Sequence, residues 1–131
     1  MDSLLKFTNF LLEKGFILIE ENKQIRITVY ELNGLFLRIE QDVNLKRFIS
    51  LSRTNNHSWK GWYDMGIIRF FIIGSPFEND SIVWFDQLSE FFVSRYTEIE
   101  QAFSLANFTR TELSLLALQK ERAKVLFGYE G

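Results

Sequence analysis

The stretch IRITVYELNGLFLRIE, residues 25–40, decides the fold because it predicts two strands joined by a tight turn. Apolar and polar residues alternate on both sides of Asn33-Gly34, as they do in strands that bury one face. An Asn-Gly pair is typical of a two-residue hairpin turn. With such a turn, however, Val29 would pair with Arg38, and the apolar face of one strand would lie beside the charges of the other.

A turn of three residues, 32–34, brings the apolar residues of the two strands together. It pairs Val29 with Leu37 and Ile27 with Ile39. The register of a hairpin is fixed by the face that it buries. We therefore predict this longer turn, with its glycine in the left-handed conformation of a G1 bulge.

The residues around this hairpin extend the sheet and add a first helix. Residues 3–14 carry apolar side chains at helical spacing and predict a helix that ends at Gly15. Residues 16–19 and 45–52 are rich in the residue types that favour strands. Residues 16–53 therefore predict a four-stranded antiparallel meander.

The C-terminal half predicts two long helices. Apolar residues recur at steps of three and four over residues 81–105, with Asp80 or Ser81 as the cap. A capping-box sequence at residues 109–112 opens a last helix, which ends at Gly128. The apolar positions of this last helix are Leu113, Leu116, Ala117, Ala123 and Phe127.

Residues 65–73 are apolar almost throughout, and periodicity alone does not decide between strand and helix. Their β-branched content favours a strand. Asp64 is a good helix cap, Gly74 a good helix end, and Pro76 suits a stop. On residue preferences alone, both structures stay open for this segment.

Composition excludes several classes of protein. The 131 residues suit a single domain, and their 47% hydrophobic content is enough for a sizeable core. The net charge of −2 argues against a general nucleic-acid binder, which needs a basic face. Without cysteine there is no disulfide and no thiolate chemistry, which suits a cytoplasmic location. No apolar run approaches the length of a membrane span, so we expect no membrane partner.

The sequence shows no constellation that predicts catalysis. His57 is the only histidine, whereas metal sites and catalytic triads need partner residues that the sequence does not supply. Its carboxylates form no pair with opposed environments, and its glycines form no phosphate-binding loop. We therefore predict that the protein is not an enzyme and has no metal or cofactor.

Two regions are candidates for contact with a protein partner. Aromatic residues in loops are frequent at interfaces, and the loop before Trp62 contains Trp59 with His57 and Lys60. Residues 78–100 hold six acidic residues against one arginine. This segment is either a solvated helix face or an acidic patch that attracts a basic partner. Its candidate contact residues are Asp80, Asp86 and Glu90.

One segment resembles a known group of proteins. A strand at Phe48-Ile49-Ser50-Leu51, a polar loop, and Trp62-Tyr63-Asp64-Met65 leading into apolar residues resemble small bacterial α+β immunity proteins. Such proteins are encoded beside polymorphic or contact-dependent toxins, and the resemblance covers roughly residues 10–75. It implies a helix over residues 64–73, a cytoplasmic location, no catalysis and tight binding to one cognate toxin. It transfers no functional residue.

These observations predict a single α+β domain over residues 1–131. It should consist of an N-terminal helix, a four-stranded antiparallel meander, and then one short and two long helices. The predicted function is protein binding, as an immunity protein that neutralises a cognate toxin. One alternative is a structural or adaptor protein that forms a homodimer or larger oligomer through its C-terminal helices. A second alternative is a small-ligand binder or enzyme that uses the loop at residues 55–64.

Overall fold

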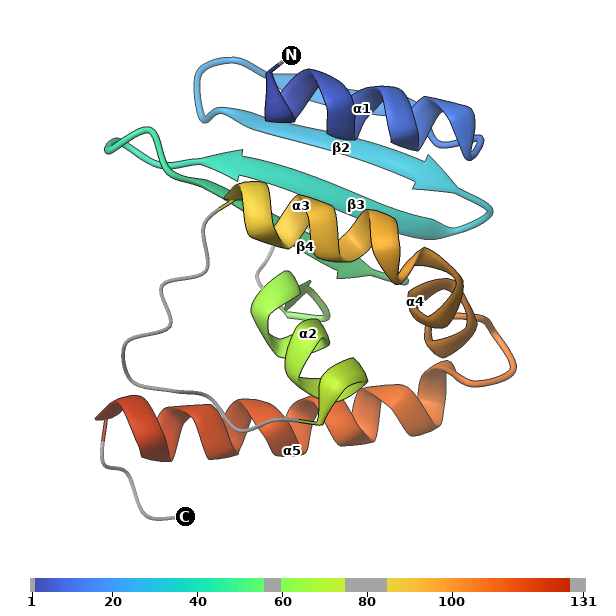
Figure 1. Ribbon diagram of the computed structural model, residues 1–131, viewed down its shortest axis with the longest axis vertical. Coiled ribbons are helices and arrows are strands. Elements are labelled where there is room, and N and C mark those ends of the chain that lie inside the picture. The colour runs from blue at the N-terminus through green and yellow to red at the C-terminus, as the bar shows by residue number, and fades with distance from the viewer. Residues whose placement is uncertain (1, 56–59, 75–84, 128–131) are drawn as a thin grey trace.

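The computed structural model describes residues 2–55, 60–74 and 85–127, with backbone only for residues 125–127. It confirms the predicted α+β architecture (Figure 1). The elements in chain order are α1 (Ser3–Glu13), β1 (Ile17–Asn22), β2 (Ile27–Leu32), β3 (Leu35–Gln41), β4 (Arg47–Ser52), β5 (Tyr63–Asp64), α2 (Met65–Ile73), α3 (Phe85–Ser94), α4 (Tyr96–Ala102) and α5 (Phe108–Phe127).

The sheet has five antiparallel strands in the order β1-β2-β3-β4-β5, one more than predicted. The additional strand, β5, consists of Tyr63 and Asp64, which pair with Leu51 and Ser50 of β4. A strand of two residues is too short to show an alternating pattern, so periodicity does not predict it. As a result, β1 and β5 form the two edges of the sheet.

The predicted three-residue turn between β2 and β3 is wrong. Leu32 lies opposite Leu35, and both Asn33 (φ 50°) and Gly34 (φ 81°) have the positive φ of a two-residue type I′ turn. The register prediction failed because it assumed that β2 buries only one face. Tyr30 is 8% exposed on the core side, yet its neighbour Val29 is only 2% exposed on the opposite side.

Arg38 explains how Val29 is buried beside a charge. It pairs with Val29 across the sheet, and its guanidinium carbon lies 4.3 Å from the ring centroid of Trp62. Its Nε is 2.7 Å from Oε1 of Glu40, although the N–H does not point at that oxygen, so the contact is ionic. The stacked arginine and tryptophan thus form an apolar cover on this face. Trp62 itself is buried, with 7% of its surface exposed.

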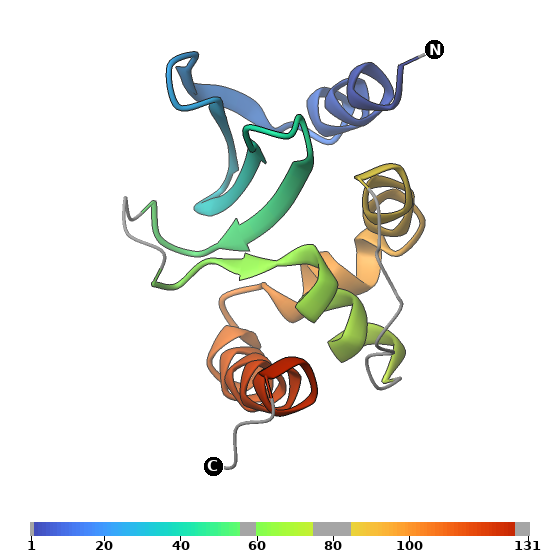
Figure 2. The ribbon, with the colours of Figure 1, turned by 90° about the vertical axis from the view of Figure 1, so that its left-hand side faces the viewer.

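Helices α1 and α3 lie side by side on the other face of the sheet (Figure 2). Between them and the sheet, aromatic rings meet edge to face. Phe7 of α1 packs on Phe92 of α3 with ring centroids 5.4 Å apart, and Phe92 packs on Tyr96 at 5.5 Å. Leu37 and Leu51 of the central strands complete the core beneath them. The aromatic-rich sequence therefore supplies the layer that fixes α1 against α3.

Residues 65–73 form the helix α2, as the resemblance implied. Oδ2 of Asp64 accepts a hydrogen bond from the backbone N–H of Ile67 at 3.3 Å, which makes Asp64 the N-cap. Gly74 ends the helix with a left-handed φ of 77°. The capping residues decided the structure of this segment where its β-branched content pointed to a strand.

The predicted continuous helix over residues 81–105 is wrong, because it is divided into α3 and α4. Arg95 separates the two helices with φ −113° and ψ 23°. The hydroxyl of Ser94 donates to the carbonyl of Phe91 at 3.2 Å, and such back-bonding bends helices. Apolar spacing continues unchanged across the break, so periodicity could not reveal it. The caps expected at residues 80–81 lie outside the described residues.

Helix α5 buries a different face from the one predicted. Leu113 and Leu116 are 67% and 45% exposed, whereas Leu115 is fully buried and Thr111 is 4% exposed. The helix also starts at Phe108, before the expected capping box. The carboxylate of that box, Glu112, instead accepts a hydrogen bond from Tyr63. Leucine content alone did not identify the buried face, because polar side chains such as Glu112 and Arg122 orient this helix through their contacts with β5.

Candidate protein-binding groove

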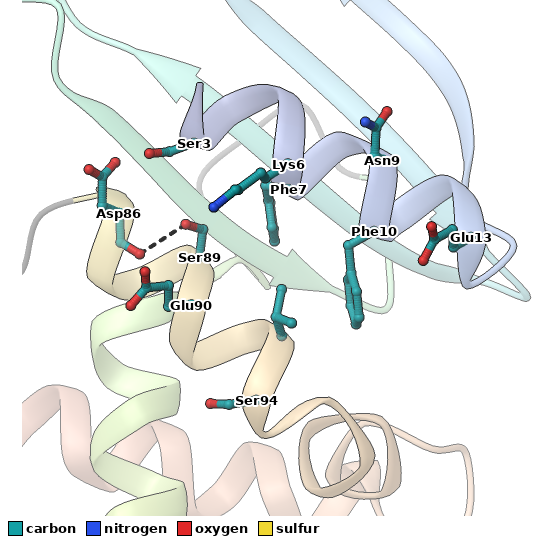
Figure 3. Close-up of a pocket in the computed structure, with 11 residues that line it drawn as sticks. Ser3, Lys6, Phe7, Asn9, Phe10, Glu13, Asp86, Ser89, Glu90 and Ser94 are labelled. Atoms are coloured by element: carbon teal, nitrogen blue, oxygen red, sulfur yellow. Dashed lines mark hydrogen bonds between the residues drawn. The ribbon is translucent and has the colours of Figure 1, made fainter. Parts of the chain in front are cut away.

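Two predicted partner-binding residues, Asp86 and Glu90, lie in a groove between α1 and α3 (Figure 3). They are one turn apart on α3, and both side chains are exposed. Lys60 is exposed as well, but it stands in the turn before β5 and does not line the groove. The other predicted residues lie outside the described part of the chain: His57, Trp59 and Asp80.

The groove is partly open and has a volume of about 610 Å³. Figure 3 shows that α1 and α3 contribute facing side chains, with Ser3 and Asp86 near one end and Glu13 near the other. The lining residues are Ser3, Lys6, Phe7, Asn9, Phe10, Glu13, Asp86, Ser89, Glu90, Val93 and Ser94.

The floor of the groove is apolar and well packed. Phe7 is 1% exposed, and its ring is held edge-to-face by Phe85 at 5.9 Å and by Phe92 at 5.4 Å. Phe10 is only partly buried, and Val93 is 40% exposed. The groove therefore offers apolar surface for a partner on a base that need not reorganise.

The rim of the groove is acidic. Glu13, Asp86 and Glu90 contribute three carboxylates against the single ammonium group of Lys6, which leaves a net charge of −2. Within the described part of the chain, no ion pair neutralises Asp86 or Glu90. Ser89 does not hydrogen-bond either carboxylate, because its hydroxyl donates to the backbone carbonyl of Asp86 at 3.0 Å. The two α3 carboxylates are thus available to cationic groups.

The cation–π contacts at one end of the groove limit where a basic partner would bind. Nζ of Lys14 lies 5.4 Å from the ring centroid of Phe10 and 5.2 Å from that of Tyr96. This ammonium adds positive charge at the end of α1 that carries Glu13. At the other end, Asp86 and Glu90 supply two carboxylates, and the side chain of Lys6 points toward that end without forming an ion pair with either of them (Figure 3).

Sequence reasoning found the α3 side of the groove and missed the α1 side. The spacing of Asp86 and Glu90 places both on one face of a helix, and that much is visible in the sequence. Lys6, Phe10 and Glu13 join them only because α1 packs along α3. No pattern in the sequence relates two helices that are separated by the whole sheet.

Tyr63 and Asp64, which belong to the alternative site at residues 55–64, are engaged with α5. The hydroxyl of Tyr63 donates to Oε2 of Glu112 at 2.5 Å, and Asp64 binds Nη1 of Arg122 at 2.8 Å. Burial, and next the hydrogen bond to Glu112, raise the pKa of Tyr63 well above its usual range. A phenol in this environment stays protonated and is not poised to act as a base.

The described residues contain no group of three or more histidine, cysteine, aspartate or glutamate side chains that could hold a metal ion. Among the same residues, no helix is both long enough and apolar enough to cross a membrane. Comparison of the chain with protein-family models, with curated proteins and with solved structures found no match.

Proposed function

We propose that this protein is a non-enzymatic protein-binding domain, and specifically a cytoplasmic immunity protein that binds and neutralises a cognate bacterial toxin. The observation that carries the binding function is the α1–α3 groove, whose apolar floor is bordered by the carboxylates of Asp86 and Glu90. The toxin as partner is supported by the resemblance of residues 48–51 and 62–65 to immunity proteins. The helical structure of residues 65–73 agrees with what that resemblance implies.

The groove fits a basic amphipathic segment of the partner. Apolar side chains of such a segment would cover Phe10 and Val93, while lysine or arginine side chains would reach Asp86 and Glu90. Exposed carboxylates at a rim mainly raise the association rate, and the desolvated apolar contacts mainly slow dissociation. A toxin that acts on nucleic acid has a basic surface, because it must bind phosphates. Occupation of that surface would block its substrate without any catalytic step by the inhibitor.

Co-expression tests this function directly. The product of the reading frame next to this gene should inhibit growth when it is expressed alone, and the wild-type chain should restore growth. The double variant Asp86→Asn/Glu90→Gln should protect less well, whereas Glu121→Gln, an exposed carboxylate on α5 outside the groove, should protect fully. A neighbouring product that is harmless, or that kills equally in the presence of wild-type chain, would rule out the immunity function.

A structural or adaptor function remains the second candidate, because α5 exposes leucines. Leu113 and Leu116 are 67% and 45% exposed, on the side of the helix away from the buried Leu115. Exposed apolar side chains at helical spacing are one route to helix–helix assembly. Replacement of both leucines by lysine should abolish any oligomer that forms through α5.

A further inference from the structure

The outward face of α5 is both apolar and basic. The inward face of this helix is fixed to β5 and the core, and Leu115 lies there. The outward face carries Leu116, Ala117, Lys120 and Lys124, which are all exposed and lie at helical spacing. Among the residues that the structure describes, no ion pair engages either lysine. These four residues, the α5 stripe, therefore offer apolar surface and two ammonium groups to another molecule.

The α1–α3 groove carries the complementary features at matching intervals. Asp86 and Glu90 are four residues apart on α3, and Val93 follows three residues later. In the reverse direction along α5, the two lysines of the stripe are also four residues apart, and its apolar residues follow three and four positions later. Two helices that pack in antiparallel directions would thus bring each lysine to a carboxylate and the apolar residues to the apolar floor.

Each surface also contains one group of the opposite sign. Lys6 lines the groove, and Glu121 is exposed beside the lysines of the α5 stripe. The groove nevertheless keeps three carboxylates against one ammonium group, and the stripe keeps two ammonium groups against one carboxylate. The two surfaces are therefore opposite in net charge, which favours their encounter and fixes their relative orientation.

The groove suits a helix better than an extended segment. Every residue that lines it belongs to α1 or α3. Backbone groups inside these helices are already paired, so an extended segment buried between them would leave its own backbone groups unpaired. A helix has no such cost. Helix α1 has 11 residues and is about 16 Å long, whereas the α5 stripe is about 12 Å long, so the stripe fits within the groove.

The α5 stripe does not reach the groove of its own chain. Figure 1 shows α1 and α5 at opposite ends of the molecule, with the sheet and α3 between them. We therefore propose that the α5 stripe of a second copy of this chain docks in the α1–α3 groove, antiparallel to α3. Lys124 of the copy then faces Asp86. Lys120 of the copy faces Glu90, and the apolar residues of the stripe cover Val93.

This contact joins two different surfaces of the chain. Two copies can therefore exchange it reciprocally, or further copies can add head to tail. In both arrangements α5 covers Asp86 and Glu90, which are the residues proposed to bind the toxin. Self-docking then regulates the groove, because toxin and copy compete for it; this consequence rests on the proposed function, whereas the docking itself does not.

Charge reversal on either surface tests the docking. The groove variant Asp86→Lys/Glu90→Lys and the helix variant Lys120→Glu/Lys124→Glu each place like charges at the contact. In light scattering over a range of concentrations, the purified wild-type chain should associate. Each variant alone should raise the dissociation constant at least about tenfold. All four side chains are exposed, so both variants should keep the wild-type circular dichroism spectrum.

A mixture of the two variants provides the decisive measurement. Opposite charges face each other again in the mixture, so an equimolar mixture should recover the association that each variant alone has lost. The matched control Lys23→Glu/Lys46→Glu reverses two exposed lysines outside both surfaces and should associate like wild type.

Three results would overturn the proposal. They are a wild-type chain that stays monomeric throughout, a mixture that associates no better than either variant alone, and a control that loses association as fully as the helix variant. No toxin is present in these measurements, so their outcome is independent of the immunity function.

Discussion

The hydroxyl of Tyr63 donates a 2.5 Å hydrogen bond to Oε2 of Glu112, which lies 49 residues further along the chain. The next residue, Asp64, binds Arg122 of the same helix at 2.8 Å. Glu112 and Arg122 both belong to α5, so two side-chain contacts join this helix to β5. These two contacts fix the last helix to the sheet and cover the β5 edge.

Removal of the Tyr63 hydroxyl should destabilise the fold, because it leaves a part-buried carboxylate without its donor. We expect Tyr63→Phe to lower the free energy of unfolding by about 1–2 kcal/mol in urea titrations. A double-mutant cycle with Glu112→Ala should give a coupling energy of at least about 0.5 kcal/mol. Strictly additive effects would show that the hydrogen bond does not form in solution.

Stability should fall at alkaline pH because of buried tyrosines. Burial, and next hydrogen bonds to Glu112 and Glu100, hold the pKa values of Tyr63 and Tyr96 well above the usual value of about 10. Above pH 10 the unfolded chain loses these phenolic protons while the folded chain keeps them, so unfolding becomes more favourable as pH rises. The fall should reach up to about 1.4 kcal/mol per pH unit for each tyrosine. Urea titrations at pH 8 and pH 11 should show a smaller loss for Tyr63→Phe than for wild type; an equal loss would contradict this assignment.

Asp64 has two roles that substitution can separate. Asn keeps the ability to cap α2 but removes the charge that binds Arg122, whereas Ala removes both. We expect Asp64→Asn to lower the free energy of unfolding by about 0–1 kcal/mol, because the ion pair is partly exposed. The Asp64→Ala variant should lower it by about 1 kcal/mol more, because the cap is lost as well. Both variants can be compared by thermal and urea unfolding. If Asp64→Asn and Asp64→Ala lowered the free energy of unfolding equally, capping would contribute nothing to stability.

The orientation of α5 can be tested with two leucines that differ only in burial. Leu115 is fully buried, so Leu115→Ala should cost about 2–5 kcal/mol. Leu113, two residues earlier, is 67% exposed, and Leu113→Ala should change stability by less than about 0.5 kcal/mol. If Leu113→Ala were more destabilising than Leu115→Ala, the buried face of α5 would be the one predicted from the sequence.

The sequence predicted the kind and order of the main elements, because local patterns determine them. Alternation over residues 25–40 identified a hairpin. Residue preferences left residues 65–73 open between strand and helix, and only the resemblance implied the helix that Asp64 and Gly74 cap. What the sequence did not determine was which face of an element would be buried. Val29 is buried under Arg38, which stacks on Trp62. Trp62 lies 24 residues after Arg38 in the chain, and no local pattern encodes such a contact.

The candidate groove was likewise predicted only in part from the sequence. Asp86 and Glu90 were recognised from the excess of acidic residues over residues 78–100. Phe10 and Glu13 were not, since their part in the groove depends on the packing of α1 along α3 across the sheet. Sequence reasoning thus finds residues that share one element, whereas a site built from two elements needs the tertiary structure.

The central claim is that the α1–α3 groove binds a basic toxin, and the most direct measurement is the affinity of the purified chain for the product of the adjacent reading frame. We expect a one-to-one complex whose affinity falls as salt concentration rises. The double variant Asp86→Asn/Glu90→Gln should weaken binding at least about tenfold, mostly by slowing association, whereas Glu121→Gln should bind like wild type. No binding by the wild-type chain, or equal affinity of the double variant and Glu121→Gln, would contradict the claim.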